Sequence, residues 1–95
     1  MLGIVKSRCG IVESVTVYDV DIDLYIKDCL ADLSASGVPK RLIESAAECE
    51  GIITAVSLYV KAYLGNDRAD TEKYLKLYRD KVFRLSLEEG DVDVE

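Results

Sequence analysis

The residues best suited to chemistry are three alternating aspartates, Asp19, Asp21 and Asp23. Their spacing copies positions 1, 3 and 5 of a calcium-binding loop, in which carboxylate oxygens ligate the ion. Such a loop also needs glycine at its sixth position and glutamate at its twelfth, where this chain has Leu24 and Leu30. We therefore expect no metal site and interpret Asp19 or Asp21 as the cap of a helix, with carboxylates that complement the helix dipole.

The chain also lacks the residues of the common catalytic and cofactor sites. It has no histidine, which excludes Ser-His-Asp and Cys-His catalysis. Cys9, Cys29 and Cys49 lie twenty residues apart with no Cys-x-x-Cys, a pattern that predicts reduced, buried thiols rather than zinc ligands or disulfides. No glycine-rich phosphate-binding sequence is present. We expect a protein without enzymatic activity and without a cofactor.

The charge distribution argues against nucleic acid as a direct partner. The net charge is −6, and five of the negative charges fall in the last eight residues, which contain no base. The remaining residues 1–87 are nearly neutral and offer no basic stripe to follow phosphates. The sequence also has no signal peptide and no apolar run of the roughly 20 residues that cross a bilayer, so no membrane association is expected.

Residues 51–64 predict the helix around which the other elements are arranged. Their only polar members, Thr54, Ser57 and Lys61, share one narrow stripe, which we expect to face water or a neighbouring subunit. The helix is apolar in every other direction and must be covered by other elements. It could begin near Ala46 or near Cys49; we favour the later start because Gly51 costs about 1 kcal/mol inside a helix relative to alanine.

The remaining sequence predicts an all-α bundle of about four helices, at residues 1–9, 20–36, 49–64 and 68–87, around this buried central helix. Residues 1–88 are expected to form one domain and residues 89–95 a flexible acidic tail. In the first helix, Val5 faces the core and Lys6 points elsewhere. The β-branched segment 11–18 has no strand to pair with, so we expect an extended connector whose apolar side chains pack on the helices. Residues 38–50 are expected to form a second connector.

Helical periodicity also predicts which side chains form the core. The tyrosines among them could in principle stack on bases, but without basic neighbours they are better explained by packing. The expected core residues are Ile22, Tyr25, Ile26, Cys29, Leu33, Ile52, Ala55, Val56, Tyr59, Val60, Tyr63, Tyr74, Tyr78, Val82 and Leu85.

A few apolar residues fall outside this pattern. Leu24, Phe83 and Leu87 each interrupt a polar helix face, and Val92 and Val94 alternate with acidic residues in the tail. Single exposed apolar side chains are common and need no explanation. Several of them close together would instead form a contact patch. Both interpretations remain open, and these five residues are the candidate interface.

The order of these segments resembles a known protein family. Asp-x-Asp-Ile-x-x-Tyr-Ile-x-x-Cys-x-x-Asp-Leu-x-x-Ser-Gly-Val begins at Asp19, and Ile-Thr-Ala-Val-Ser-Leu-Tyr-Val-Lys-Ala-Tyr-Leu-Gly-Asn-Asp begins at Ile53. Glu-Lys-Tyr-Leu-x-Leu-Tyr follows at Glu72. Over about residues 1–88 the chain is similar to the small head–tail connector proteins of tailed phages, also called adaptor or head-completion proteins and often labelled DNA-packaging proteins.

The resemblance implies an all-α subunit that forms a homo-oligomeric ring at the portal vertex of a filled capsid. The partners would be the portal protein and the next neck or tail-completion protein, with the C-terminal segment reaching toward the portal. The protein would assemble in the host cytoplasm and end in the virion neck. Two alternatives are a small DNA-packaging factor resembling a terminase small subunit and a prophage-derived interaction module.

Overall fold

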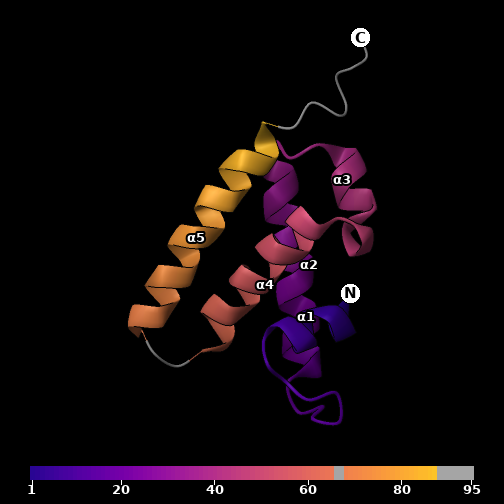
Figure 1. Ribbon diagram of the computed structural model, residues 1–95, viewed down its shortest axis with the longest axis vertical. Coiled ribbons are helices and arrows are strands. Elements are labelled where there is room, and N and C mark those ends of the chain that lie inside the picture. Colours follow the sequence, from indigo (N-terminus) through magenta and orange to yellow (C-terminus); the bar gives the residue numbers. More distant parts are fainter. Residues whose placement is uncertain (66–67, 88–95) are drawn as a thin grey trace.

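The computed structural model describes residues 1–65 and 68–87, and every regular element in this part of the chain is helical (Figure 1). The elements are α1 (Leu2–Arg8), α2 (Asp19–Ala35), α3 (Lys40–Glu44), a 3₁₀ helix η1 (Ala46–Glu48), α4 (Glu50–Leu64) and α5 (Arg68–Ser86). The predicted all-α class is therefore confirmed. The four predicted helices match α1, α2, α4 and α5, and no end differs by more than one residue.

Helix α4 lies at the centre of the described structure. It packs against α1, α2, η1 and α5, and it forms an antiparallel hairpin with α5 (Figure 1). Four of its side chains, Ile52, Ala55, Val56 and Val60, are fully buried. The helix begins at Glu50 after Cys49, which confirms the later of the two predicted starts. Gly51 lies in its first turn, where α5 approaches closely. A side chain at this position would bring a Cβ to 3.0 Å from the Leu85 side chain, and glycine avoids this tight contact.

The sequence predicted correctly how α2 ends but not how it is capped at its start. The helix is preceded by Tyr18, and no side chain caps it. The prediction that Asp19 or Asp21 is the cap is therefore wrong. Both residues lie in the first helical turn, where their charge favours the N-terminal end of the helix dipole. At the other end, Gly37 adopts φ +91°, a left-handed conformation that glycine tolerates and that ends the helix as expected.

The second connector contains two short helices that the sequence did not predict. Helix α3 and η1 are five and three residues long, too short to show a helical period. They bury Leu42 and Ala46, and the preceding Val38 is buried with them. The Ser45 hydroxyl donates to the Arg41 carbonyl oxygen and caps neither η1 nor α4.

The predicted core is largely confirmed. Most of its aliphatic members are buried in one cluster together with Cys29 and Tyr78, and Tyr25 and Tyr59 pack on that cluster half-buried. Tyr74 is half-buried outside the cluster. Tyr63 was expected in the core but is 47% exposed. Its ring contacts the half-buried rings of Tyr59 and Tyr25 instead of entering the core cluster.

A short hydrogen-bonded chain joins α2 to α5 through the core. The Tyr78 hydroxyl donates to Asp32 Oδ2 at 2.6 Å, and the Cys29 thiol donates to the Tyr78 hydroxyl oxygen at 3.6 Å. Burial raises the pKa of the Cys29 thiol to about 12. The pKa of Tyr78 is also raised, first by burial and then by its bond to Asp32. The folded state therefore retains both protons in alkaline solution.

These raised pKa values predict that the protein loses stability at high pH. Above about pH 9 the unfolded chain releases the Cys29 proton that the folded chain still holds, so the unfolded state is favoured by up to about 1.4 kcal/mol per pH unit for this group. Urea unfolding at pH 8 to 10.5 should show this decline. Cys29→Ala should flatten the pH dependence while lowering stability at pH 8. An equally steep decline in the variant would contradict the assignment.

The polar stripe of α4 is only partly accessible, so the expectation that it faces water or a neighbouring subunit is wrong for Ser57. Ser57 is 5% exposed, and its Oγ has no hydrogen-bond partner within the described residues. Thr54 and Lys61 are half-buried. The stripe is covered because α4 has neighbours on every side, so one hydroxyl is buried at a cost.

Replacing this serine should stabilise the protein. Ser57→Ala removes a buried, unpaired hydroxyl and introduces a better helix former, so the free energy of unfolding should rise by about 1 kcal/mol in urea titrations. The matched control is Ser34→Ala on the exposed face of α2, where only the smaller propensity term of about 0.5 kcal/mol applies. A loss of stability in Ser57→Ala would show that the hydroxyl is satisfied in solution.

Candidate interaction surfaces

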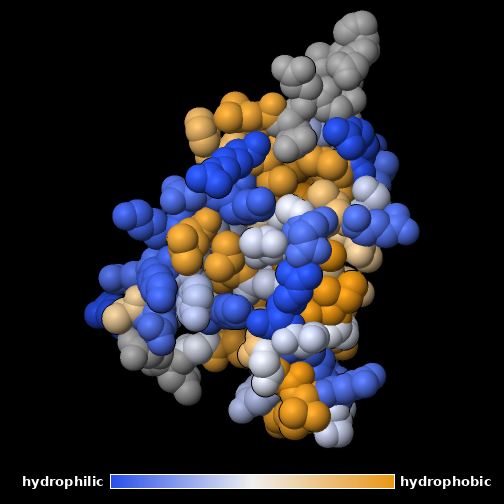
Figure 2. All heavy atoms as spheres, viewed as in Figure 1, coloured by the Kyte–Doolittle hydropathy of each residue, from blue (hydrophilic) through white to orange (hydrophobic). Residues whose placement is uncertain are grey.

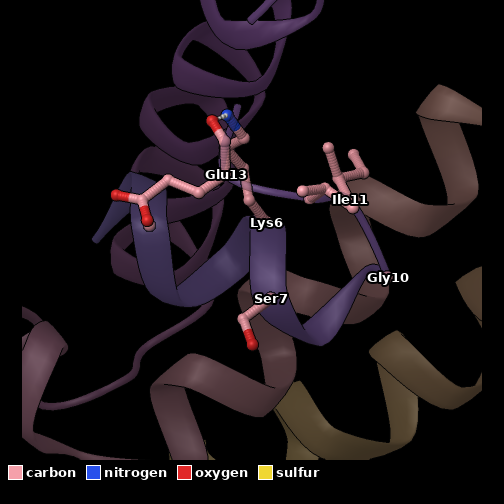
Figure 3. A pocket seen from close by; sticks show the side chains of 7 residues that line it. Lys6, Ser7, Gly10, Ile11 and Glu13 are labelled. Atoms are coloured by element: carbon pink, nitrogen blue, oxygen red, sulfur yellow. Dashed lines mark hydrogen bonds between the residues drawn. The ribbon is translucent and has the colours of Figure 1, made fainter. Parts of the chain in front are cut away.

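The ammonium group of Lys6 fixes the loop between α1 and α2. Lys6 is only 4% exposed, and its Nζ donates to the carbonyl oxygens of Glu13 and Val15 at 3.0 and 2.7 Å. It also lies 2.9 Å from Asp19 Oδ1, in the first turn of α2. Figure 3 shows the side chain extending from α1 to the Glu13 carbonyl, beside a hollow of about 510 Å³. The sequence placed Lys6 off the side of this helix that carries Val5, but it did not predict that Lys6 would be buried beneath the following loop.

The loop held in this way carries an exposed apolar surface. Val12 and Val17 are 65% and 75% exposed, and Val20 and Leu24 follow on one exposed face of α2. We call Val12, Val17, Val20 and Leu24 the N-terminal apolar surface. The sequence had predicted that the side chains of residues 11–18 pack on the helices, but only Ile11 is half-buried. The core is already filled by the helices and by residues 38–46, which leaves these valines outside.

A second apolar surface lies at the end of α5. Phe83 and Leu87 are 65% and 62% exposed and are four residues apart, so they extend along one side of the chain end. We call this pair the C-terminal apolar surface. The structure thus places Leu24, Phe83 and Leu87 on the outside of the molecule, with Leu24 apart from the other two. Val92 and Val94 lie outside the described residues.

The two surfaces occupy opposite ends of the molecule. The described chain is elongated, with a longest extent of 45 Å. The loop after α1 lies at the lower end in Figure 1, and the C-terminal end of α5 lies at the upper end. Figure 2 shows hydrophobic atoms gathered over both of these regions. A subunit with unlike apolar ends can contact unlike surfaces on its neighbours.

A basic and apolar groove opens between α1, the end of α4 and α5. Lys61 contributes a cation 5.8 Å from the centre of the Tyr74 ring, and Arg8 contributes a second cation that pairs with Glu50 at 2.7 Å. The Cys9 thiol also lines this groove. Burial raises the pKa of Cys9, and the nearby Lys61 ammonium acts in the opposite direction.

The tyrosines form an aromatic cluster between α2, α4 and α5. The Tyr59 ring is tilted against Tyr63 at 4.7 Å between ring centres and meets Tyr78 edge to face at 5.2 Å, and Tyr25 lies 5.9 Å from Tyr63. Asp28 and Asp32 line the hollow beside it, and Arg79 is its single base. The net charge of these lining residues is negative and would repel phosphates, so the cluster is a poor stacking platform for nucleic acid.

The remaining chemistry of the described residues is limited. The three aspartates diverge, since Asp19 pairs with Lys6 and Asp23 with Lys27. Residues 1–65 and 68–87 contain no group of three or more histidine, cysteine or acidic side chains that could hold a metal ion. No helix in these ranges is long and apolar enough to cross a membrane.

Comparison with known proteins identifies the family. The family model described as phage connector protein matches residues 1–92, which is nearly the whole chain. The chain belongs to the phage connector proteins. This confirms the family resemblance in the sequence, and the described part of this connector is a helical bundle with apolar ends. Searches of curated proteins and of solved structures found no significant match.

Sequence reasoning missed the role of Lys6 and, apart from Leu24, the residues of the N-terminal apolar surface. A lysine at a helix position next to Val5 is normally solvated, and nothing local reveals that two carbonyl groups from the following loop will meet it. The one available signal was negative: residues 11–18 had neither a helical period nor a strand to pair with.

The Lys6 contacts predict a large loss of stability when the ammonium is removed. Lys6→Met keeps the apolar stem but leaves the Asp19 carboxylate and two carbonyl groups without their cation, so the free energy of unfolding should fall by about 3 kcal/mol. Amide hydrogen exchange in residues 11–18 should also accelerate. In the matched control Lys27→Met, the exposed pair with Asp23 should contribute less than about 0.5 kcal/mol. Equal effects of the two substitutions would disprove the anchoring role.

Proposed function

We propose that this connector acts without catalysis, as a homo-oligomeric ring at the portal vertex of a tailed phage. There it completes the DNA-filled head and joins it to the neck or tail. The observation that carries the proposal is the pair of apolar surfaces at opposite ends of a chain that belongs to the phage connector family. The partners are other copies of the chain, the portal protein and the next neck or tail-completion protein.

The geometry of the surfaces supports assembly into a ring. A contact between unlike surfaces of identical subunits is head-to-tail, and it produces a closed ring when the rotation between neighbours completes a circle. A pair of identical surfaces would instead give a twofold dimer. The N-terminal and C-terminal apolar surfaces consist of different residues at opposite ends of the molecule, so they favour the head-to-tail arrangement.

The charge of the described residues supports an adaptor over a DNA-binding packaging factor. Lys6 is buried and so is unavailable to DNA, whereas Arg8, Lys27 and Lys40 are exposed bases whose weak ion pairs with carboxylates lower the local positive charge. A net negative ring would also let DNA pass through its channel without binding it. Subunits made in the host cytoplasm would then reside in the virion neck.

The proposal predicts that Phe83 contributes to assembly and not to folding. Phe83→Asp places a charge on a side chain that is 65% exposed, so the melting temperature should change by no more than about 2 °C. Ring formation or binding to purified portal, measured by sedimentation velocity and pull-down, should weaken by at least about tenfold because an interface core excludes charge.

A matched control separates this effect from a general change in surface charge. Leu77 is also an exposed aliphatic residue of α5, but it lies on a different side of the helix from Phe83 and Leu87. Leu77→Asp should leave association intact. A large drop in the melting temperature of Phe83→Asp would show that Phe83 is a core residue, and unchanged association would remove the C-terminal apolar surface from the interface.

A further inference from the structure

The groove between α1, α4 and α5 has a composition suited to one kind of ligand. Its volume is about 540 Å³, and two of its nine lining residues are cationic while none is acidic. Ile11 and Leu64 supply aliphatic walls, and the rings of Tyr18 and Tyr74 border it. The groove therefore fits a short segment that alternates small apolar side chains with carboxylates.

The cations of this groove are available to a ligand to different degrees. Lys61 has no carboxylate within ion-pair distance among the described residues, and its ammonium lies over the Tyr74 ring. Arg8 already pairs with Glu50, whose side chain is 69% exposed. An exposed pair of this kind is weak, so Arg8 can exchange its partner at little cost. Lys61 is thus the principal attractive charge.

The C-terminus of the chain has the matching pattern. Residues 91–95 read Asp-Val-Asp-Val-Glu, with Val92 and Val94 between three acids. In an extended conformation, successive side chains point to opposite faces, so both valines would lie on one face and the carboxylates on the other. We propose that residues 91–95 of a second copy of this chain bind in the groove, with the valines against Ile11 and Leu64 and a carboxylate on Lys61.

The reach of the chain selects a second copy as the source. The Ala62 carbonyl oxygen accepts a hydrogen bond from the Thr71 hydroxyl at 2.9 Å, so the Leu64 end of the groove lies about sixteen residues, or about 24 Å, back along α5 from Leu87. From Leu87 a fully extended chain reaches at most about 18 Å by Val92. A molecule's own tail could therefore not place Val92 against Leu64 in its own groove. The inference rests on the proposed function in one respect, since it requires copies of the chain to associate.

Cys9 provides a reporter inside the groove. We would add a synthetic peptide of residues 86–95 to the full-length double variant Val92→Ser/Val94→Ser, whose own tail lacks the valines but keeps its charge. Saturating peptide should slow alkylation of Cys9 by iodoacetamide at least about threefold, because thiol reactivity requires access. Cys49 is half-buried, does not line the groove and should react at an unchanged rate, as mass spectrometry of the digest would show.

Two matched comparisons test the chemistry of recognition. A peptide with both valines replaced by serine has the same charge and should give no protection. Lys61→Gln in the protein should raise the half-saturating peptide concentration about tenfold at low salt, whereas Lys73→Gln should not, since Lys73 approaches the same Tyr74 ring without lining the groove.

The outcomes separate this inference from the proposed function. In the wild-type protein, protection of Cys9 should increase with protein concentration; protection that is independent of concentration would mean that each tail occupies its own groove. If rings form and the peptide does not protect Cys9, the groove assignment is wrong and the proposed function stands. If the peptide binds but the chain neither self-associates nor binds the portal, the proposed function is what fails.

Discussion

The structure depends on one constraint: α4 is apolar around almost its whole circumference and must be enclosed. Each neighbouring element covers part of it, with α5 and α2 along its length, α1 across one side and η1 at its start. The enclosure is close enough that a Cβ at Gly51 would make a tight contact with Leu85 and that the hydroxyl of Ser57 is buried without a partner among the described residues. The other helices are amphipathic because each has only one face turned to this centre.

The same constraint explains why the interaction surfaces lie at the ends. The helices and residues 38–46 fill the space around α4, so the loop after α1 has no core to enter. Lys6 fixes the backbone of this loop through two carbonyl groups, while the side chains of Val12 and Val17 remain exposed. At the other end Leu85 of α5 packs on Gly51 of α4, while Phe83 and Leu87 lie on another side of α5 and remain uncovered. The centre of the molecule supplies stability, and the two ends are free for assembly. This division is consistent with the proposed role of this connector in assembly.

The prediction from sequence was most accurate where a pattern repeats over several turns. The limits of the long helices, the late start of α4 and the burial of Ile22, Ile26 and Val60 all follow from periodicity and glycine placement. Short segments were predicted less well. Neither α3 nor η1 is long enough to show a period, and Tyr63 was assigned to the core because angular position on a helix says nothing of how far a neighbouring helix extends.

The sequence by itself determined the fold class, the order of the helices, the absence of histidine chemistry and the family, because these depend on residue type and regular spacing. Only the tertiary structure decided which charged groups are buried and which apolar groups are exposed. Lys6 is enclosed by a loop that follows it, Cys29 and Tyr78 meet across 49 residues of chain, and Lys61 meets Cys9 and Tyr74 in one groove. These contacts join residues distant in sequence, so no local pattern encodes them, and they define the surfaces on which we expect this connector to assemble.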